Sequence, residues 1–208
     1  MKIEHLASAP DRAGRYLVKF DDGKTIRLYR QTVEDFTLYP GLELDEEQME
    51  KLRRAAGQMS AKMRAIRIVS ASSVSKKDLQ RRLIQKGEDP KHAMEAVNWM
   101  SDLSLIDDLE TARQVVERCI RKGYGLARAK QALYEKRIPK EYWEEALSDY
   151  PQQLDAIGEY LKSHLDSTSD MKEIKKAVDA LIRRGHSYGT IRRVLNTLSF
   201  DTEQFPED

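Results

Sequence analysis

The sequence has little cysteine, few aromatic residues and no long apolar run, and each shortage excludes a class of protein. Cys119 is the only cysteine among 208 residues, so the chain has no internal disulfide, and its apolar helical surroundings predict a buried structural thiol. No apolar run approaches the roughly 18–20 residues that span a bilayer. Residues 1–12 mix acidic and basic side chains and lack an apolar signal core, so we expect a cytoplasmic protein without membrane contact.

The motifs of common enzyme and metal sites are also missing. There is no Gly-x-x-x-x-Gly-Lys-Ser/Thr loop that would cradle a nucleotide phosphate. The four histidines are scattered, without the spacing that zinc sites need. Asp107 and Asp108 are adjacent at a helix start, where we expect a cap with a solvated neighbour rather than a pair of metal ligands. We therefore expect no enzyme activity, no catalytic residue, no metal and no cofactor.

Charge, in contrast, is abundant and unevenly placed. Charged residues make up 34% of the chain and hydrophobic residues 40%, which suits a helix-rich globular protein rather than a disordered one. Residues 60–140 hold 18 basic and 10 acidic side chains, whereas residues 141–208 hold 8 basic and 14 acidic ones. A basic middle part can steer a polyanion or an acidic protein surface toward one face. Solvated helix faces with an uneven lysine content are the alternative.

The first 40 residues have the pattern of a small sheet. Residues 14–20 and 25–29 are rich in strand-forming residues, and Asp21-Asp22-Gly23-Lys24 lies between them. This arrangement predicts a hairpin, because glycine tolerates the positive φ of a tight turn. Residues 3–6 could add a third strand. We expect a β-rich extension over residues 1–44, either a hairpin or three strands, that packs on neighbouring helices.

From Asp45 onward the pattern is helical. Asp45 is a candidate N-cap for a long helix whose apolar stripe runs from Met49 to Ile66 and which Gly57 could bend or interrupt. Further on, CIRKGYG (119–125) and LIRRGHS (181–187) each place a basic pair before a glycine. In both we expect the glycine to end a helix, the ring after it to pack at the turn, and the basic side chains to satisfy the last carbonyls.

These turns belong to a longer repeat. Leu79 and Leu83 correspond to Ala129 and Leu133 at an offset of 50 residues, and Gly123 corresponds to Gly185 at an offset of 62. The additional residues of the third cycle fall around a loop over residues 167–170. We therefore expect a mainly α protein of tandem three-helix repeats in an elongated stack, with units at residues 45–108, 109–157 and 158–208.

Five segments, taken in order, carry a resemblance to a known family. They are SKKDLQRRLIQKGEDP (75–90), LIDDLETA (105–112), RKGYGLARAKQAL (121–133), KRIPKEYWEEAL (136–147) and KKAVDALIRRGHSYGTIRRVL (175–195). They resemble the RecX family of bacterial recombination regulators, over roughly residues 60–205 and more loosely over the N-terminal hairpin. The chain departs from the family pattern at Leu105, Thr111 and His186, where aromatic residues are usual.

The resemblance implies a regulatory protein that binds the filament of the RecA recombinase on single-stranded DNA. Such a protein inhibits ATP hydrolysis, filament extension and strand exchange, and so modulates recombination, DNA repair and the SOS response; a weak DNA contact is compatible with this role. No long heptad repeat is present, so we expect a monomer. Two alternatives stay open, a direct DNA-binding protein of helix-turn-helix-like units and a helical scaffold for an unrelated protein.

We expect the partner-binding residues among the basic side chains beside helix ends, where a charged partner surface or a DNA phosphate could accept them. Tyr124, Tyr134, Tyr142 and Trp143 could add contact rings, although Trp143 is expected in the core. Each basic side chain could instead lie on a solvated helix face or support a helix end. The candidates are Arg81, Arg82, Lys86, Arg121, Lys122, Arg128, Lys130, Lys136, Arg137, Arg183, Arg184, Arg192 and Arg193.

Overall fold

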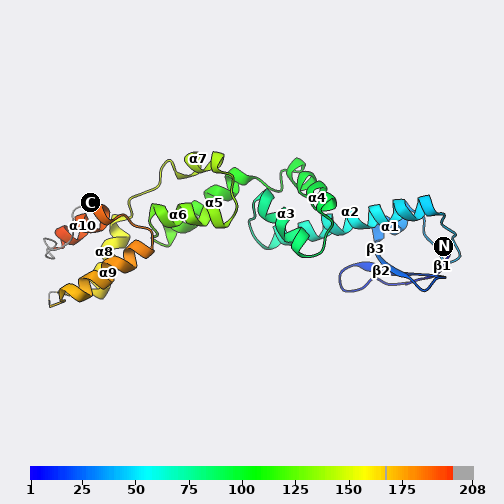
Figure 1. Cartoon of the computed structure of the whole chain (residues 1–208), viewed down its shortest axis with the longest axis horizontal. Helices are drawn as coiled ribbons and strands as arrows, with labels where there is room; N and C mark the ends of the chain where they lie inside the picture. The colour runs from blue at the N-terminus through cyan, green and yellow to red at the C-terminus, as the bar shows by residue number, and fades with distance from the viewer. Residues whose placement is uncertain (167, 199–208) are drawn as a thin grey trace. The chain divides into compact units, whose positions relative to one another are not determined.

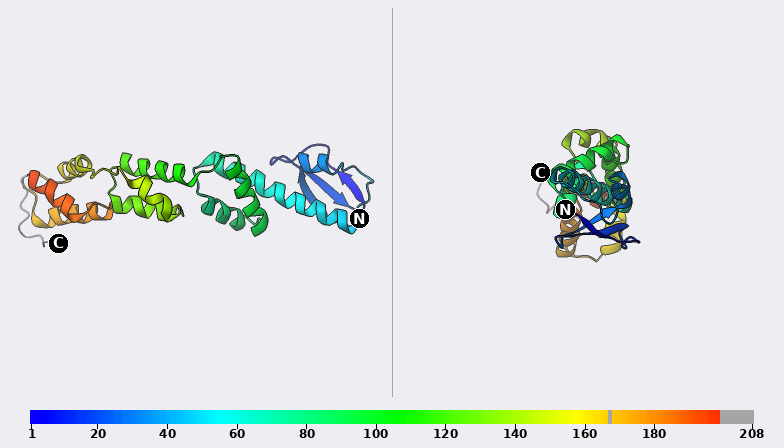
Figure 2. Two further views of the ribbon diagram at one scale, coloured as in Figure 1. Left: turned by 90° about the horizontal axis from the view of Figure 1, so that it is seen from above. Right: turned by 90° about the vertical axis from the view of Figure 1, so that its right-hand side faces the viewer.

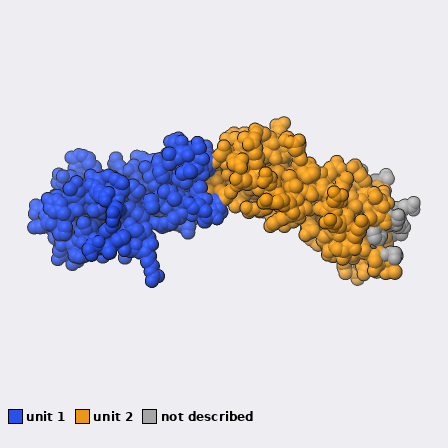
Figure 3. All heavy atoms as spheres, turned by 180° about the vertical axis from the view of Figure 1, so that it is seen from behind, with its two compact units in different colours: residues 1–72, 76–106 blue, residues 73–75, 107–208 orange. Residues whose placement is uncertain are grey.

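A computed structural model describes residues 1–166 and 168–198 of the chain (Figure 1). This part is mainly α-helical with one small antiparallel sheet, as the sequence predicts. It forms two compact units, an N-terminal unit of residues 1–72 and 76–106 and a C-terminal unit that holds residues 73–75 and begins again at residue 107 (Figure 3). Within these described ranges no helix is long and apolar enough to cross a membrane.

The sheet of the N-terminal unit consists of β1 (Ile3–Leu6), β2 (Arg15–Phe20) and β3 (Thr25–Tyr29), paired antiparallel in that order (Figure 2). The register of the hairpin sets Val18 opposite Ile26. Gly23 in the turn has a φ of +78°, which strains any residue with a Cβ. The Asp-Gly hairpin and the third strand are therefore both confirmed.

Helices α1 (Arg30–Asp35) and α2 (Glu46–Ala71) pack against this sheet. The short helix α1 was not predicted. The Asp45 carboxylate accepts the Gln48 N–H at 2.8 Å and the Gln48 side chain accepts the Asp45 N–H at 2.9 Å, so the expected cap is a complete capping box. The core between sheet and helix includes Phe20, Leu28 and Leu52, all at most 2% exposed.

Gly57 lies inside α2, which runs from Glu46 to Ala71, so the interruption that the sequence analysis considered at this glycine does not occur. A Cβ at this position would lie 2.5 Å from ring atoms of His92. His92 belongs to α4 (Pro90–Asp102), which packs against both α2 and α3 (Lys76–Gln85). Gly57 therefore serves the close approach of α4 to α2.

The C-terminal unit contains α5 (Asp108–Arg121), α6 (Leu126–Glu135), the 3₁₀ turn η1 (Lys140–Tyr142), α7 (Trp143–Leu147), α8 (Leu154–His164), α9 (Met171–Arg183) and α10 (Tyr188–Thr197). One apolar cluster gathers residues of α5 and α6 with Trp143 and Leu147 of α7 at its edge, and a second gathers residues of α8, α9 and α10. Cys119 is buried, as predicted, and burial raises the pKa of its thiol. The expected loop is present at residues 168–170, whereas Ser167 lies outside the described residues.

The division into three three-helix units stays a prediction. The predicted boundary between residues 157 and 158 lies inside α8, which begins at Leu154 and packs with α9 and α10.

Three helices end in the same way, at glycines that the sequence marks. Gly87, Gly123 and Gly185 follow α3, α5 and α9 with φ of +89°, +62° and +88°. In α5 the Gly123 N–H donates to the Ile120 carbonyl and the Tyr124 N–H to that of Cys119, and the same pair of bonds recurs after α3 and α9. Backbone amides thus satisfy these carbonyls, in place of the basic side chains that we expected.

Two further details differ from the sequence analysis. Asp107 caps α5, accepting the Leu109 and Glu110 N–H groups at 2.8 and 3.0 Å, but its neighbour Asp108 is buried rather than solvated. Arg137 follows α6 with a φ of +56°, so an arginine occupies the conformation that glycine takes at the other helix ends.

Candidate functional site

The two repeated turns lie against each other in the C-terminal unit. The Gly125 N–H donates to the Arg184 carbonyl at 3.0 Å and the Ala127 N–H donates to the Gly185 carbonyl at 3.2 Å. The start of α6 therefore satisfies the carbonyls that follow α9, and the opposite ends of the two helix dipoles meet. Gly125 and Gly185 permit this contact between segments about 60 residues apart.

The glycines leave no room for side chains at this contact. A Cβ on Gly125 would lie 2.0 Å from the Gly185 carbonyl oxygen, and one on Gly185 would lie 2.3 Å from the Arg128 nitrogen. The sequence indicated that Gly185 ends a helix. It gave no sign that the glycine of one turn also makes space for the backbone of the other.

The His186 ring, which follows Gly185, also packs at this contact. The His186 imidazole is buried, and its Nε2 lies 3.0 Å from the Gly123 carbonyl, to which it donates because the carbonyl can only accept. Burial lowers the pKa of His186, and the nearby Arg184 charge acts in the same direction. The expectation that a ring packs at the turn is confirmed for His186.

Exposed cations from both turns surround one cleft of about 620 Å³, which we call the turn cleft. Arg121 is the last residue of α5 and Lys122 is its C-cap, and Arg184 is the C-cap of α9. Helix α8 forms a second wall of this cleft and contributes Asp155 and Glu159. The remaining lining residues are Ile120, Gly123, Gln153, Ala156, Tyr160 and Ser163.

Neighbouring groups hold parts of the turn cleft in place. The Arg184 guanidinium carbon lies 4.9 Å from the centre of the Tyr160 ring, a cation–π distance, and Tyr160 in turn stacks on His164 at 4.0 Å. The Gln153 side chain donates to the Ile120 carbonyl at 3.1 Å. Arg184 is therefore oriented before any partner arrives.

A second cleft, of about 420 Å³, lies beside the same turns and includes one predicted residue, Lys130. Leu126 and Lys130 of α6 line it together with Pro151 and His186. The Tyr150 hydroxyl, also in its lining, donates to the Tyr124 carbonyl at 2.7 Å, and burial raises the pKa of Tyr150 to about 12. This hydroxyl thus ties the linker after α7 to the first turn.

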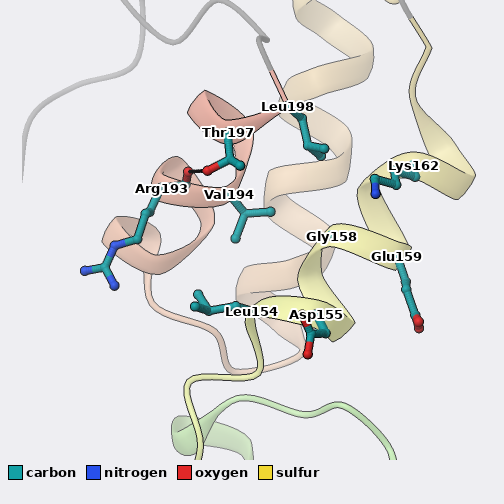
Figure 4. Close-up of a pocket in the computed structure, with 9 residues that line it drawn as sticks. All are labelled: Leu154, Asp155, Gly158, Glu159, Lys162, Arg193, Val194, Thr197 and Leu198. Atoms are coloured by element: carbon teal, nitrogen blue, oxygen red, sulfur yellow. Dashed lines mark hydrogen bonds between the residues drawn. The ribbon is translucent and has the colours of Figure 1, made fainter.

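A third cleft, of about 440 Å³, separates α8 from α10 (Figure 4). Leu154 and Val194 form part of its apolar lining, and Arg193 is the one predicted residue in it. Arg193 donates to the Gln152 side chain at 3.0 Å. Asp155 and Glu159 line this cleft as well as the turn cleft, and Figure 4 shows the Glu159 side chain directed away from Val194.

Two of the three predicted residues of the N-terminal unit, Arg81 and Arg82, form ion pairs within their own helix. Arg81 Nη2 and Arg82 Nε lie 2.7 and 2.8 Å from the two oxygens of the buried Asp78 carboxylate. Lys86 is exposed, and its carbonyl accepts from Arg64 at 2.6 Å. Asp78 therefore neutralises part of the charge of Arg81 and Arg82, and their spacing of three and four residues from Asp78 could have indicated these ion pairs.

The other predicted residues are divided between paired and exposed positions. Arg128 lies 3.0 Å from Glu135, whose pKa is lowered by this hydrogen bond. The carbonyls of Lys136 and Arg137 lie 2.7 and 3.4 Å from the Ser75 hydroxyl. Arg183 is exposed and Arg192 is half-buried.

The sequence analysis missed two charged groups near the first turn. Arg118 is exposed in the last turn of α5, three residues before Arg121, so helical spacing could have found it. Glu159 contributes a negative wall to the turn cleft, and no pattern in the sequence relates it to the repeated turns.

Comparisons with known proteins agree on one family. Residues 107–147 match the family model described as RecX, second three-helix domain. The chain is 30% identical to a regulatory protein RecX of Vibrio parahaemolyticus over 154 residues, which cover 73% of this chain and 97% of the relative. It is 28% identical to a protein of the same name from Clostridioides difficile, over 96% of both chains. A crystal structure of regulatory protein RecX, 22% identical, matches 94% of this chain and 98% of its own with a TM-score of 0.65, which supports the fold. The chain belongs to the RecX family of regulatory proteins.

Proposed function

We propose that this chain binds the filament of the RecA recombinase on single-stranded DNA and inhibits its ATP hydrolysis, extension and strand exchange. The observation that supports this most is the contact between the two repeated basic turns in a member of the RecX family. Because of this contact, Arg121, Lys122 and Arg184 lie around one cleft of a single compact unit. Charged groups that are already positioned bind with a smaller loss of conformational entropy than groups on mobile loops.

The chain would act by occupying its partner, without a catalytic site, metal or cofactor of its own. We propose that it does so in the cytoplasm as a monomer that contacts several protomers of the polymer. Separate weak contacts on one chain reinforce one another, because the first contact raises the effective concentration of the others. Basic residues outside the turn cleft, such as Lys86 and Lys130, would then add further weak contacts.

DNA-stimulated ATP hydrolysis by the RecA of the same organism tests the proposal. The protein is titrated from far below one molecule per RecA protomer, with single-stranded DNA in excess. We expect progressive loss of hydrolysis at substoichiometric amounts. An unchanged rate at equimolar protein would remove the proposal.

A charge reversal tests the assignment of the site. The double variant Arg121→Glu/Lys122→Glu should raise the amount of protein needed for half-inhibition at least tenfold, since two attractive contacts become repulsive. Lys175→Glu/Lys176→Glu, at exposed positions of α9, is the matched control and should have a smaller effect. Unchanged inhibition by the first variant, with an unchanged circular dichroism spectrum, would refute the site and leave the family membership intact.

Direct DNA binding is the alternative function, and the 18 basic residues among residues 60–140 favour it. A DNA-binding protein needs no recombinase, and its affinity falls steeply with salt as counterions return to the phosphates. We expect weak binding to bare single-stranded DNA at moderate salt. Tight, salt-dependent binding without RecA would instead support the alternative.

A further inference from the structure

We propose that the turn cleft accepts a protein segment that carries an acidic side chain close to a basic one, and not the phosphate backbone of nucleic acid. This inference rests on the proposed function and specifies the chemistry of the partner at that site. It follows from the two walls of the cleft, which carry opposite charges.

The basic wall suits a carboxylate. Arg121, Lys122 and Arg184 are exposed, and the Arg184 guanidinium is stacked over the Tyr160 ring. A guanidinium held against a ring in this way can form two parallel hydrogen bonds to a planar carboxylate. A phosphate could also bind at this wall, so the basic side chains alone do not separate the two kinds of partner.

The acidic wall makes the distinction. Asp155 and Glu159 are exposed on α8 and line the same cleft. Among the described residues neither carboxylate has a basic group within 4.0 Å, so the two walls do not neutralise each other by direct ion pairs. A chain of phosphates that entered the cleft would therefore meet two negative charges at short range, which is unfavourable.

A protein segment with both signs of charge satisfies both walls. Its acidic side chain would face Arg121, Lys122 and Arg184, and its basic side chain would face Glu159 and Asp155. The volume of about 620 Å³ lies within the range of roughly 300–1,000 Å³ that is usual for ligand clefts, enough for a few side chains. The arrangement also discriminates against uniformly charged surfaces, since either sign alone is repelled by one wall.

The variant Glu159→Lys tests this proposal, because it removes the net negative charge of the acidic wall and leaves the basic residues of the cleft unchanged. It is compared with Glu50→Lys, the same change of charge at an exposed position of α2 in the other unit. Two quantities are measured at one salt concentration. One is the amount of protein needed for half-inhibition of RecA ATP hydrolysis, and the other is the affinity for a labelled single-stranded oligonucleotide without RecA, read by fluorescence anisotropy.

We expect Glu159→Lys to raise the half-inhibition amount about tenfold relative to Glu50→Lys. Its affinity for the bare oligonucleotide should stay equal or increase, since a repulsive charge has been removed. The Asp155→Asn/Glu159→Gln double variant changes the net charge of the wall by the same amount without adding a cation. It should shift inhibition in the same direction and guards against misfolding of the lysine variant.

Two results would overturn the inference while the proposed function stands. One is inhibition by Glu159→Lys that equals that of Glu50→Lys, and the other is inhibition that improves together with oligonucleotide affinity, as expected for a phosphate in the cleft. Loss of inhibition by the wild-type protein is a separate result and would refute the proposed function itself.

Discussion

Replacing Gly125 by alanine should separate the two repeated turns. The backbone of Gly125, with φ −77° and ψ 167°, is open to any residue, so the cost is steric and comes from the neighbouring turn. The new Cβ would lie 2.0 Å from the Gly185 carbonyl oxygen and 2.3 Å from the His186 nitrogen. Ordinary contact needs roughly 3.4 Å, so the two backbones must move apart by about 1.4 Å.

That movement sets the size of the effect. Hydrogen bonds of 3.0 and 3.2 Å, from the Gly125 and Ala127 N–H groups, would lengthen beyond bonding range. Overpacking costs about 1–3 kcal/mol, and leaving a buried polar group unpaired costs about 1–3 kcal/mol more. The loss of glycine at an N-cap contributes about 1 kcal/mol. We therefore expect a destabilisation of the C-terminal unit by about 3–7 kcal/mol.

Urea denaturation followed by circular dichroism, together with hydrogen exchange at the Gly125 and Ala127 amides, measures this loss. Gly158→Ala is the control in the same unit, because its Cβ would lie 3.8 Å from Val194, an ordinary contact. Inside α8 that change should stabilise by about 0.5–1 kcal/mol through helix propensity. If Gly125→Ala were as stable as Gly158→Ala, and the amides of residues 125 and 127 stayed protected from hydrogen exchange, the reasoning about the contact between the turns would be refuted.

Three further predictions concern stability. Arg64→Met should destabilise the N-terminal unit by about 2–4 kcal/mol, measured by urea denaturation. The reason is that the buried Glu88 carboxylate loses its ion pair with the Arg64 Nε at 2.7 Å and keeps only the hydrogen bond from the Ser60 hydroxyl at 2.9 Å. A loss below about 1 kcal/mol would contradict this. Burial lowers the pKa of His186, so the unfolded chain binds the proton more readily than the folded one. The stability of the protein should therefore decrease as the pH falls below about 6.5, the pKa of histidine in an unfolded chain. In His186→Phe the melting temperature should depend less on pH below this value, and an equal pH dependence in both proteins would refute the prediction. Arg137→Gly should raise the melting temperature, since the φ of +56° strains a residue with a Cβ by about 1 kcal/mol. A lower melting temperature would show that the arginine side chain contributes more stability than the strain costs.

Local chemistry made much of the fold predictable. The positive φ of Gly23 follows from an Asp-Gly pair between two strand-like runs. Asp45 before two glutamates marks a helix start, and Gly123 and Gly185 mark helix ends, because each choice depends on a few neighbouring backbone atoms. Asp170 and Glu173 form a capping box that the same rules could have found, with a 2.8 Å bond from the Glu173 N–H to the Asp170 carboxylate.

The site was less predictable because it depends on contacts between distant segments. The sequence repeats the basic pair at an interval of 62 residues but does not say that one copy packs on the other. Nor does it say that α8 places Glu159 in the same cleft as Arg121, since the packing of α8 sets that position. The arginines at 137 and 184 show the same limit. One adopts a backbone conformation typical of glycine and the other stacks on Tyr160, and neither follows from local propensity.

The repeated glycines connect the fold to the proposed site. Gly123 and Gly185 each end a helix just after a basic pair, and Gly185 together with Gly125 allows the backbones of the two turns to meet. The cations therefore surround one cleft because their backbones are hydrogen-bonded together, and not only because basic residues are numerous. Gly125→Ala keeps every charge of the wild type but should weaken inhibition of RecA, whereas Gly158→Ala should not. Full inhibition by a Gly125→Ala protein whose amides have lost protection would mean that the partner recognises the number of charges and not their arrangement.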